Sequence, residues 1–265
     1  MIIEIDDPAD PRVEPYLDIR ERDLRGHGAR FVIEGEVVLR VALSRGRYPI
    51  ESILLATNRV VPLLDALAAC PAAVPVYVAA PSVLARIAGF PLHRGVLAFG
   101  RCDRSGTGSW NALPEAPARA LVLVLSGISN HDNMGGLFRN AAAFGVSLVL
   151  VDETSCDPLY RKAIRVSAGA ALTVPFRRAG SISSLSRDLE RLGFDVLATS
   201  PRGKLEVAEL VPGPRTAVVF GAEGHGLPAE LLSSARTIRI DMAPGMDSLN
   251  VATASGIVLH RLRMP

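Results

Sequence analysis

The second half of the chain alternates short apolar runs with segments of helical periodicity. The apolar runs are almost uninterrupted, which is typical of parallel strands that are buried on both faces. Because strands that alternate with helices pair in a parallel sheet, the pattern predicts an α/β fold with helices on both faces of the sheet. The predicted strands are residues 121–125, 147–151, 194–199 and 216–220, and the predicted helices are 135–144, 184–192, 228–234 and one that begins near Ser248.

The first part of the chain shows the same alternation on a smaller scale. A stretch rich in Gly, Ser and Pro then separates the two parts, as linkers commonly do. We therefore predict a small N-terminal α/β domain over residues 1–102, a linker over 103–119 and a larger domain over 120–265. Within the small domain, helical spacing covers 35–43 and 82–88, and strand-like runs cover 52–56, 74–78 and 95–99.

The composition is that of an ordinary globular protein, with 49% hydrophobic and 21% charged residues, so the chain can bury a core. No apolar run reaches the length of a membrane-spanning helix, and the acidic N-terminus does not resemble a secretory signal. Cys70, Cys102 and Cys156 lie far apart, which argues against a disulfide framework or a zinc site. We expect a cytoplasmic protein. The net charge of +2 is compatible with a nucleic-acid partner without requiring one.

The first candidate segment, residues 130–145, follows the predicted strand 121–125. Its polar residues therefore lie at the carboxyl edge of the sheet, where open α/β proteins bind ligands. We expect Asn133 to cap the helix that follows. Arg139 lies within that helix among small and apolar residues, so it either extends into solvent or contacts an anion. His131 is interpreted as a surface group rather than a general base.

The second candidate segment, residues 218–227, is a strand that runs into a glycine-rich turn. Glycines let a ligand approach the backbone closely, although many such turns are only tight connections. The spacing matches neither a Walker loop nor the dinucleotide fingerprint. Glu223 within this turn would repel a phosphate and favours a cationic ligand.

The third candidate segment, residues 238–251, is a short strand, a loop and the start of the final helix. Asp247 or Ser248 is the expected cap of that helix, and a capped helix without further function would explain most of the segment. Asn250 is the exception, because asparagine is unfavourable in a first helical turn unless its amide has a partner.

Together these segments resemble the SpoU (TrmH) family of RNA ribose 2′-O-methyltransferases in the SPOUT superfamily. The first resembles N-x-G-x-x-x-R-x-x-x-x-F-G, the second G-x-E-x-x-G-L, and the third I-P-M followed after a loop by S-L-N-V. The matching residues are Asn133, Gly135, Arg139, Phe144 and Gly145, then Gly221, Glu223, Gly226 and Leu227, and finally Ile240, Met242, Ser248, Leu249, Asn250 and Val251.

The resemblance covers residues 121–263, and residues 31–101 are similar to the small RNA-binding domain, related to ribosomal protein L30e, that many members carry. The chain departs from the family pattern in three places. Asp241 stands where proline is usual, Ala252 where serine is common, and Asn130-His131 where Asp-Pro is usual.

The resemblance implies a C-terminal trefoil knot, a homodimer that shares its active site, and S-adenosylmethionine as cofactor. It also implies methylation of a ribose 2′-hydroxyl in structured RNA, with ribosomal RNA favoured over transfer RNA. We expect no metal, because no His, Cys or carboxylate cluster has ligand spacing, and no membrane, because no apolar run is long enough. The implied catalytic residues are Arg139, Asn133, Glu223, Ser248 and Asn250, and the implied cofactor-binding residues are Thr199, Gly221, Gly226, Ile240, Met242, Ser248 and Leu249.

Arg139 corresponds to the family's proposed catalytic arginine. A guanidinium stays protonated in proteins, so we expect Arg139 to anchor a phosphate and stabilise the developing alkoxide rather than to act as a base. Glu223 either faces the cationic cofactor or orients Asn133 and Asn250 by hydrogen bonds. Ser248 and Asn250 would position the ribose or the cofactor tail.

Two other interpretations are open. A non-catalytic RNA-binding protein could keep this fold, but binding alone would not need all of the implied catalytic residues. A Rossmann-type methyltransferase would carry its glycine-rich loop after the first strand of the sheet. This chain has residues 126–130 at that position, and its glycine turn comes late in the sequence.

Overall fold

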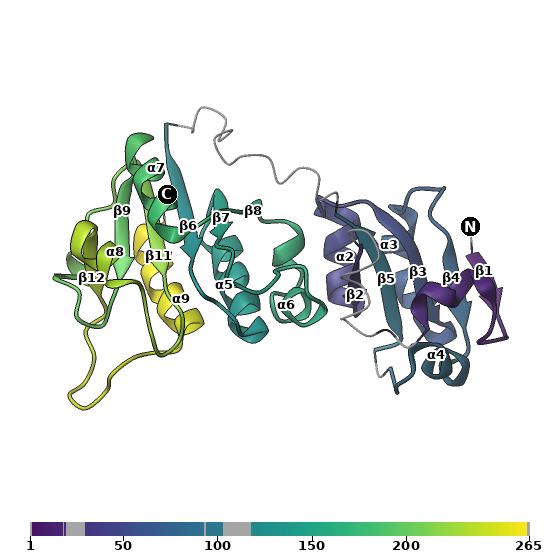
Figure 1. Ribbon diagram of the computed structural model, residues 1–265. Helices are drawn as coiled ribbons and strands as arrows, with labels where there is room; N and C mark the ends of the chain where they lie inside the picture. The colour runs from purple at the N-terminus through teal and green to yellow at the C-terminus, as the bar shows by residue number, and fades with distance from the viewer. Residues whose placement is uncertain (1, 18, 20–29, 93, 103–117, 264–265) are drawn as a thin grey trace. The chain divides into compact units, whose positions relative to one another are not determined.

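The computed structural model describes residues 2–17, 19, 30–92, 94–102 and 118–263, which form two compact units (Figure 1). The first unit contains the described residues up to 102 together with Leu159–Thr173, and the second contains the remainder. Leu159–Thr173 thus groups with the first unit, whereas the predicted boundary assigned every residue after 119 to the larger domain. Apart from residues 118 and 119, the predicted linker lies outside the described residues.

The first unit is built on a mixed five-stranded sheet with the order β1-β4-β3-β5-β2, in which β5 runs antiparallel to both of its neighbours. One face packs against α4 and the short 3-10 helix η1, and α2 contacts β2 and β5. The elements are β1 (Ile2–Ile5), η1 (Pro11–Tyr16), β2 (Arg30–Glu34), α2 (Glu36–Arg45), β3 (Ile50–Ala56), α3 (Leu64–Ala68), β4 (Val76–Ala79), α4 (Pro81–Ala88), β5 (Val96–Arg101) and α6 (Arg161–Val166).

The second unit contains an all-parallel seven-stranded sheet with the order β10-β12-β9-β11-β6-β7-β8. The strands are β6 (Ala120–Leu125), β7 (Leu148–Val151), β8 (Phe176–Arg178), β9 (Asp195–Thr199), β10 (Leu205–Glu206), β11 (Arg215–Phe220) and β12 (Arg236–Arg239). The helices are α5 (His131–Ala143), α7 (Ile182–Arg191), α8 (Ala229–Ser234) and α9 (Val251–Leu262).

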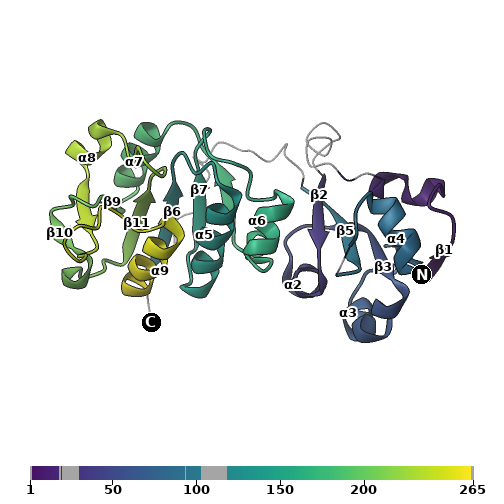
Figure 2. The same ribbon diagram turned by 90° about the horizontal axis from the view of Figure 1, so that it is seen from below.

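Helices cover both faces of this parallel sheet, as Figure 2 shows from below. Leu185 and Leu189 of α7 and Leu231 of α8 pack with alternate residues of β6, β9 and β11 in one buried cluster. On the opposite face α5 and α9 lie side by side (Figures 1 and 2). The predicted fold class is therefore confirmed. The trefoil knot stays a prediction, because strand order and register do not specify how a chain threads.

The predicted strands and helices of the larger domain correspond to observed elements, and no end differs by more than four residues. The short edge strands β8 and β10 and helix α6 lie outside the predicted elements, since segments this short carry little periodic signal. None of the described helices is long and apolar enough to cross a membrane.

Candidate active site

Four parallel strands of the second unit end at the same edge of the sheet. Register pairs Phe220 with Leu125 and Ile238 with Thr199, so the loops after β6, β9, β11 and β12 leave the sheet together. The last three of these loops and the start of α9 enclose a cavity of about 860 Å³. Its lining includes every residue predicted to bind the cofactor: Thr199, Gly221, Gly226, Ile240, Met242, Ser248 and Leu249.

A hydrogen-bond network joins the three candidate segments at this cavity. The side-chain amide of Asn133 donates to Glu223 Oε1 at 2.6 Å. The amide of Asn250 donates to Asn133 Oδ1 at 2.9 Å and to Glu223 Oε1 at 3.2 Å. Asn133 is buried, whereas Glu223 and Asn250 are exposed and line the cavity. Glu223 therefore uses one carboxylate oxygen to orient two amides, which is the second of its two predicted roles.

The prediction that Asn133 caps α5 is wrong. Asn130 caps this helix, and its Oδ1 accepts from the backbone N–H of Asp132 at 2.7 Å. Asn133 lies inside the first turn instead and directs its side chain to Glu223. Both asparagines precede helical residues, so the local pattern alone does not distinguish the cap from the residue that makes the distant contact.

The prediction that Asp247 or Ser248 caps the final helix is also wrong. Asn250 is the cap, and its Oδ1 accepts from the backbone N–H groups of Ala252 at 3.0 Å and Thr253 at 3.3 Å. Its amide nitrogen holds Asn133 and Glu223, so both polar atoms of this side chain are in use. This explains the asparagine that was unexpected from the sequence. Ser248 stays in the exposed loop that lines the cavity.

The glycine turn after β11 closes on itself. The N–H of Gly226 donates to the carbonyl of Ala222 at 3.0 Å, and Gly224 and Gly226 have positive φ values of 87° and 67°, which glycine adopts without strain. A β-carbon at Gly221 would lie 2.5 Å from the carbonyl carbon of Gly226. The backbone of this tight turn therefore leaves no room for a side chain at Gly221. The same turn holds Glu223 beside the cavity.

Arg139 does not join the other predicted catalytic residues. It lies on the exposed side of α5 and does not line the cavity. It lies six positions after Asn133 in this helix, which places it about 9 Å further along the helix axis. Within the described residues, no hydrogen bond or ion pair holds its guanidinium. His131 begins α5 and is half-buried.

Asp152, which the sequence reasoning missed, supports the loop between β6 and α5. Its buried carboxylate accepts hydrogen bonds from the Ser155 hydroxyl at 2.7 Å, the Thr154 hydroxyl at 2.8 Å, the Ser126 hydroxyl at 3.0 Å and the Gly127 N–H at 3.1 Å. Burial raises the pKa of Asp152, but the hydrogen bonds from these donors together hold the pKa below its ordinary value. A lone Asp after a strand, followed by Thr and Ser, is the only sequence signal for this role.

Further cavity residues were also missed, although they are neighbours of predicted ones. Arg239 donates to the carbonyls of Gly203 at 3.2 Å and Lys204 at 3.1 Å, and so holds the turn after β9 against β12. Arg202 and His225 are exposed and line the cavity. In the part of the chain that the structure describes, no three His, Cys, Asp or Glu side chains gather into a possible metal site.

The whole chain is similar to known RNA methyltransferases in sequence and in structure. An uncharacterised tRNA/rRNA methyltransferase of Mycobacterium tuberculosis is 39% identical over 267 residues, covering 97% of this chain and 90% of that protein. The solved structure of an RNA 2′-O ribose methyltransferase has a TM-score of 0.77 at 26% identity and covers 98% of each chain. The AdoMet-bound rRNA methyltransferase from Sinorhizobium meliloti shares the fold, with a TM-score of 0.76 at 22% identity over 99% of this chain and 97% of that one.

The family assignment rests on the larger part of the chain. The family model described as SpoU rRNA Methylase matches residues 120–260, which include all three candidate segments and the cavity that they form. The predicted enzyme class, an RNA methyltransferase, is confirmed by this match and by the full-length relative. The chain belongs to the SpoU rRNA methylase family.

Proposed function

We propose that this protein uses S-adenosylmethionine to methylate a ribose 2′-hydroxyl in structured ribosomal RNA in the cytoplasm. One observation carries the proposal: the hydrogen-bonded network of Asn133, Glu223 and Asn250 brings three distant segments together at a single cavity. The AdoMet-bound S. meliloti rRNA methyltransferase and the RNA 2′-O ribose methyltransferase, which share the fold, support the choice of cofactor and reaction.

The cavity suits an extended, cationic small molecule. Its volume of about 860 Å³ lies within the usual range of small-molecule sites. Ile240, Met242 and Leu249 supply apolar lining, Gly221 allows backbone contact, and Glu223 supplies negative charge at the rim. When bound, S-adenosylmethionine supplies an electrophilic methyl group on a positively charged sulfur. Ser248, on the same lining, has a hydroxyl that is available to position the ribose or the cofactor tail.

Arg139 is the proposed catalytic group that contacts RNA. Its guanidinium remains protonated, so it donates hydrogen bonds to a phosphate and stabilises the alkoxide that forms as the ribose hydroxyl loses its proton. A phosphate or a water molecule takes that proton. Preorganised donors of this kind lower the barrier because no solvent has to reorient around the developing charge.

We also propose a homodimer in which Arg139 of one protomer serves the cavity of the other. Arg139 projects from α5 without a partner among the described residues and does not line the cavity of its own chain. A shared site would explain why the other predicted catalytic residues gather at the cavity without it.

In the first unit, Arg59 and Arg94 are the proposed RNA-docking residues. A β-carbon at Gly35 would lie 3.0 Å from Cδ of Arg94, and one at Gly95 would lie 3.3 Å from Cγ of Arg59. The two arginines therefore lie at one edge of the mixed sheet, where β2 and β3 end and β5 begins. Guanidinium groups at such an edge match the phosphate backbone of RNA.

The test is methyl transfer from labelled S-adenosylmethionine to ribosomal RNA and to transfer RNA, followed by mapping of 2′-O-methyl groups. We expect label on a ribose 2′-oxygen of ribosomal RNA. Methylation of transfer RNA alone would contradict the proposed substrate. Binding of RNA without any methyl transfer would favour the non-catalytic alternative instead.

A further inference from the structure

An asparagine that no motif includes connects the two helices that carry the first and third segments. Asn140 lies in the interior of α5, where asparagine is a poor helix former. Its amide donates to the carbonyl oxygen of Ala252 at 2.6 Å and to Ser255 Oγ at 2.8 Å. Ser255 is fully buried and donates in turn to the carbonyl of Ala252 at 2.8 Å. The amide of Asn140 thus holds the first turn of α9.

Asn140 lies on the same face of α5 as Asn133. Seven residues make almost two complete turns of an α-helix, so residues at this spacing face the same neighbour. Gly136 lies between them, and a β-carbon there would come 2.6 Å from the β-carbon of Ala252. Two asparagine contacts and one close backbone approach therefore fix both the distance of α5 from α9 and its rotation about its own axis.

That rotation decides where Arg139 points. No hydrogen bond or ion pair among the described residues orients its guanidinium, so its direction follows from the helix that carries it. Arg139 precedes Asn140 by one residue and projects about 100° away from the face that contacts α9. If the C-terminal half of α5 turned about its axis, Arg139 would move, while Asn133 in the first turn of the helix would still hold Glu223 and Asn250.

We infer that Asn140 is a positioning residue for the reaction: it holds α5 against the first turn of α9 and thereby aims Arg139. The inference rests on the proposed function, in which Arg139 contacts RNA. Asn140 itself contacts neither RNA nor the cofactor. Asn133 keeps its hydrogen bonds to Glu223 and from Asn250 when Asn140 is changed, so we expect the loops that carry the cofactor-binding residues to keep their arrangement.

The first experiment compares Asn140→Leu, Arg139→Ala and the double variant. Leucine keeps most of the side-chain volume and removes both donated hydrogen bonds. We expect the turnover number of Asn140→Leu to fall about 10-fold, because small errors in position are costly at a reacting centre, while S-adenosylmethionine affinity stays within about twofold. The double variant should be no slower than Arg139→Ala alone, since residues that act as one unit are not additive. Multiplied losses in the double variant would overturn the inference.

A milder variant covers the case in which Asn140→Leu folds poorly. Ser255→Ala removes one acceptor of the Asn140 amide and should lower turnover in the same direction by a smaller factor. Ser233→Ala is the matched control, because Ser233 Oγ also donates to a carbonyl three residues earlier, at 2.8 Å, but in α8 and away from this contact. Equal turnover in both serine variants would contradict the inference.

Amide hydrogen exchange supplies a readout that does not depend on activity. In Asn140→Leu the amides of the first turn of α9 should exchange faster, while those of β11 keep their protection. If the wild-type protein methylates no RNA but Asn140→Leu still speeds exchange in the first turn of α9, the proposed function is contradicted while the structural contact of Asn140 with α9 is supported. An active wild type with unchanged turnover in Asn140→Leu would mean that only the inference has failed.

Discussion

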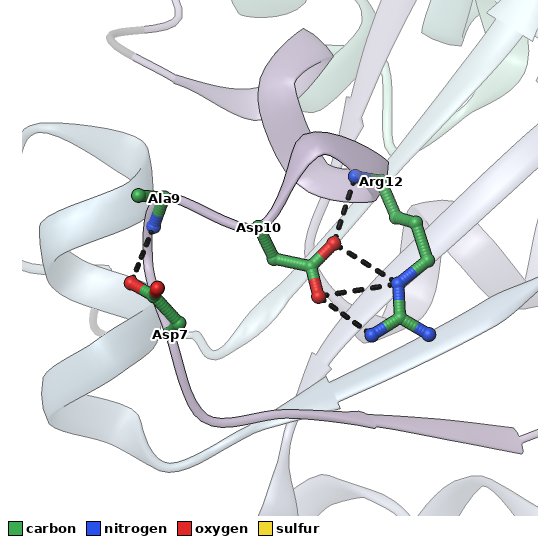
Figure 3. Close-up of polar contacts among 4 residues, drawn as sticks. All are labelled: Asp7, Ala9, Asp10 and Arg12. Carbon is green, nitrogen blue, oxygen red and sulfur yellow. Dashed lines mark hydrogen bonds and ion pairs between the residues drawn. The ribbon is translucent and has the colours of Figure 1, made fainter.

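In the first unit, Asp10 and Glu51 form ion pairs with residues that are neighbours in the chain or in the sheet, whereas in the second unit the hydrogen bonds of Asn133 join segments that are far apart in the sequence. Arg12 forms an ion pair with Asp10, two residues away (Figure 3), and Glu51 of β3 forms ion pairs with Arg30 and Arg101 of the same sheet. By contrast, Asn133 bonds to residues 90 and 117 positions later in the sequence.

This difference separates two uses of polar groups. Exposed ion pairs between neighbours contribute little to stability because solvent screens them. Hydrogen bonds between distant segments at a buried asparagine are specific, because an unsatisfied partner there would be costly. We therefore expect substitutions at the edge of the parallel sheet to have large effects on function, and substitutions in the first unit to have small ones.

The largest effect is expected for Gly221→Val. The valine side chain would collide with the Gly226–Leu227 backbone, open the turn and displace Glu223, so S-adenosylmethionine binding should be lost in calorimetry. Because the turn is exposed, circular dichroism should stay close to that of the wild type. Gly180→Val is the control, since a β-carbon there meets nothing closer than Ser184 Oγ at 3.8 Å. Normal binding by Gly221→Val would move the cofactor site elsewhere.

Arg139→Ala should lower turnover by roughly 10²-fold or more, the usual cost of losing one preorganised donor. Cofactor affinity should stay nearly unchanged, because Arg139 does not line the cavity. Arg139→Lys should restore little, since a point charge does not reproduce the guanidinium fork. Steady-state kinetics and calorimetry measure both quantities. A solvated helix arginine predicts wild-type turnover for both variants, and that outcome would remove Arg139 from the mechanism.

Mixing Arg139→Ala chains with Glu223→Ala chains tests whether the site is shared between protomers. Heterodimers would keep one composite site with an intact Arg139 and an intact Glu223, so activity should recover to a fraction of the wild-type rate. The two inactive homodimers are the controls. Recovery of no activity after confirmed subunit exchange would show that each site uses its own arginine.

A moderate effect on stability is expected for Asp152→Asn, which should lose about 2 kcal/mol of unfolding free energy at pH 7, the scale of hydrogen bonds to a charged group. The pKa of Asp152 is lowered in the folded protein, so its contribution is present above the unfolded pKa of about 3.9 and is lost as the pH falls through the folded pKa. Thermal unfolding of the two proteins should therefore converge below about pH 4. A stability difference between the wild type and Asp152→Asn that is independent of pH would contradict this account.

Asp10→Asn sharpens the comparison between the units. The side-chain hydrogen bond from Arg12 lowers the pKa of Asp10 to about 2. As for Asp152, the carboxylate therefore stabilises the folded protein above its unfolded pKa, and this contribution to the free energy of unfolding is lost between about pH 4 and pH 2. The pair is exposed, so the loss at pH 7 should be smaller than for Asp152→Asn and should disappear in high salt. A larger loss than for Asp152→Asn would reverse the comparison.

The smallest effect is expected for Arg59→Ala and Arg94→Ala. Each should weaken RNA binding severalfold and reduce the dependence of that binding on salt by about one released counterion. Cofactor binding should stay unchanged, since both residues belong to the first unit. Filter binding at several salt concentrations measures the slope. An unaltered slope in both variants would locate the RNA contact on another surface.

Local pattern alone was enough to predict the architecture of the second unit. The apolar runs that became β6, β7, β9 and β11 are buried on both faces, and continuous burial of this kind occurs only where helices cover both sides of a sheet. The pattern also placed the polar residues of the first segment at the carboxyl edge of the sheet, which is the edge where the structure brings the three segments together.

Only the tertiary structure decided which asparagine caps a helix and which one bonds to a distant segment. Asn130 caps α5 and Asn133 holds Glu223, while Asn250 both caps α9 and holds Asn133. Each of these side chains could make a local hydrogen bond, so the choice depends on which partner the fold brings within reach. The same applies to Asn140, whose partners come from α9, and to Asp152, which holds Ser126 and Gly127 as well as its neighbours Thr154 and Ser155. A contact between residues about a hundred positions apart produces no hydrophobic periodicity in the sequence. The contact of Asn140 with α9 therefore becomes visible only when α5 packs against α9.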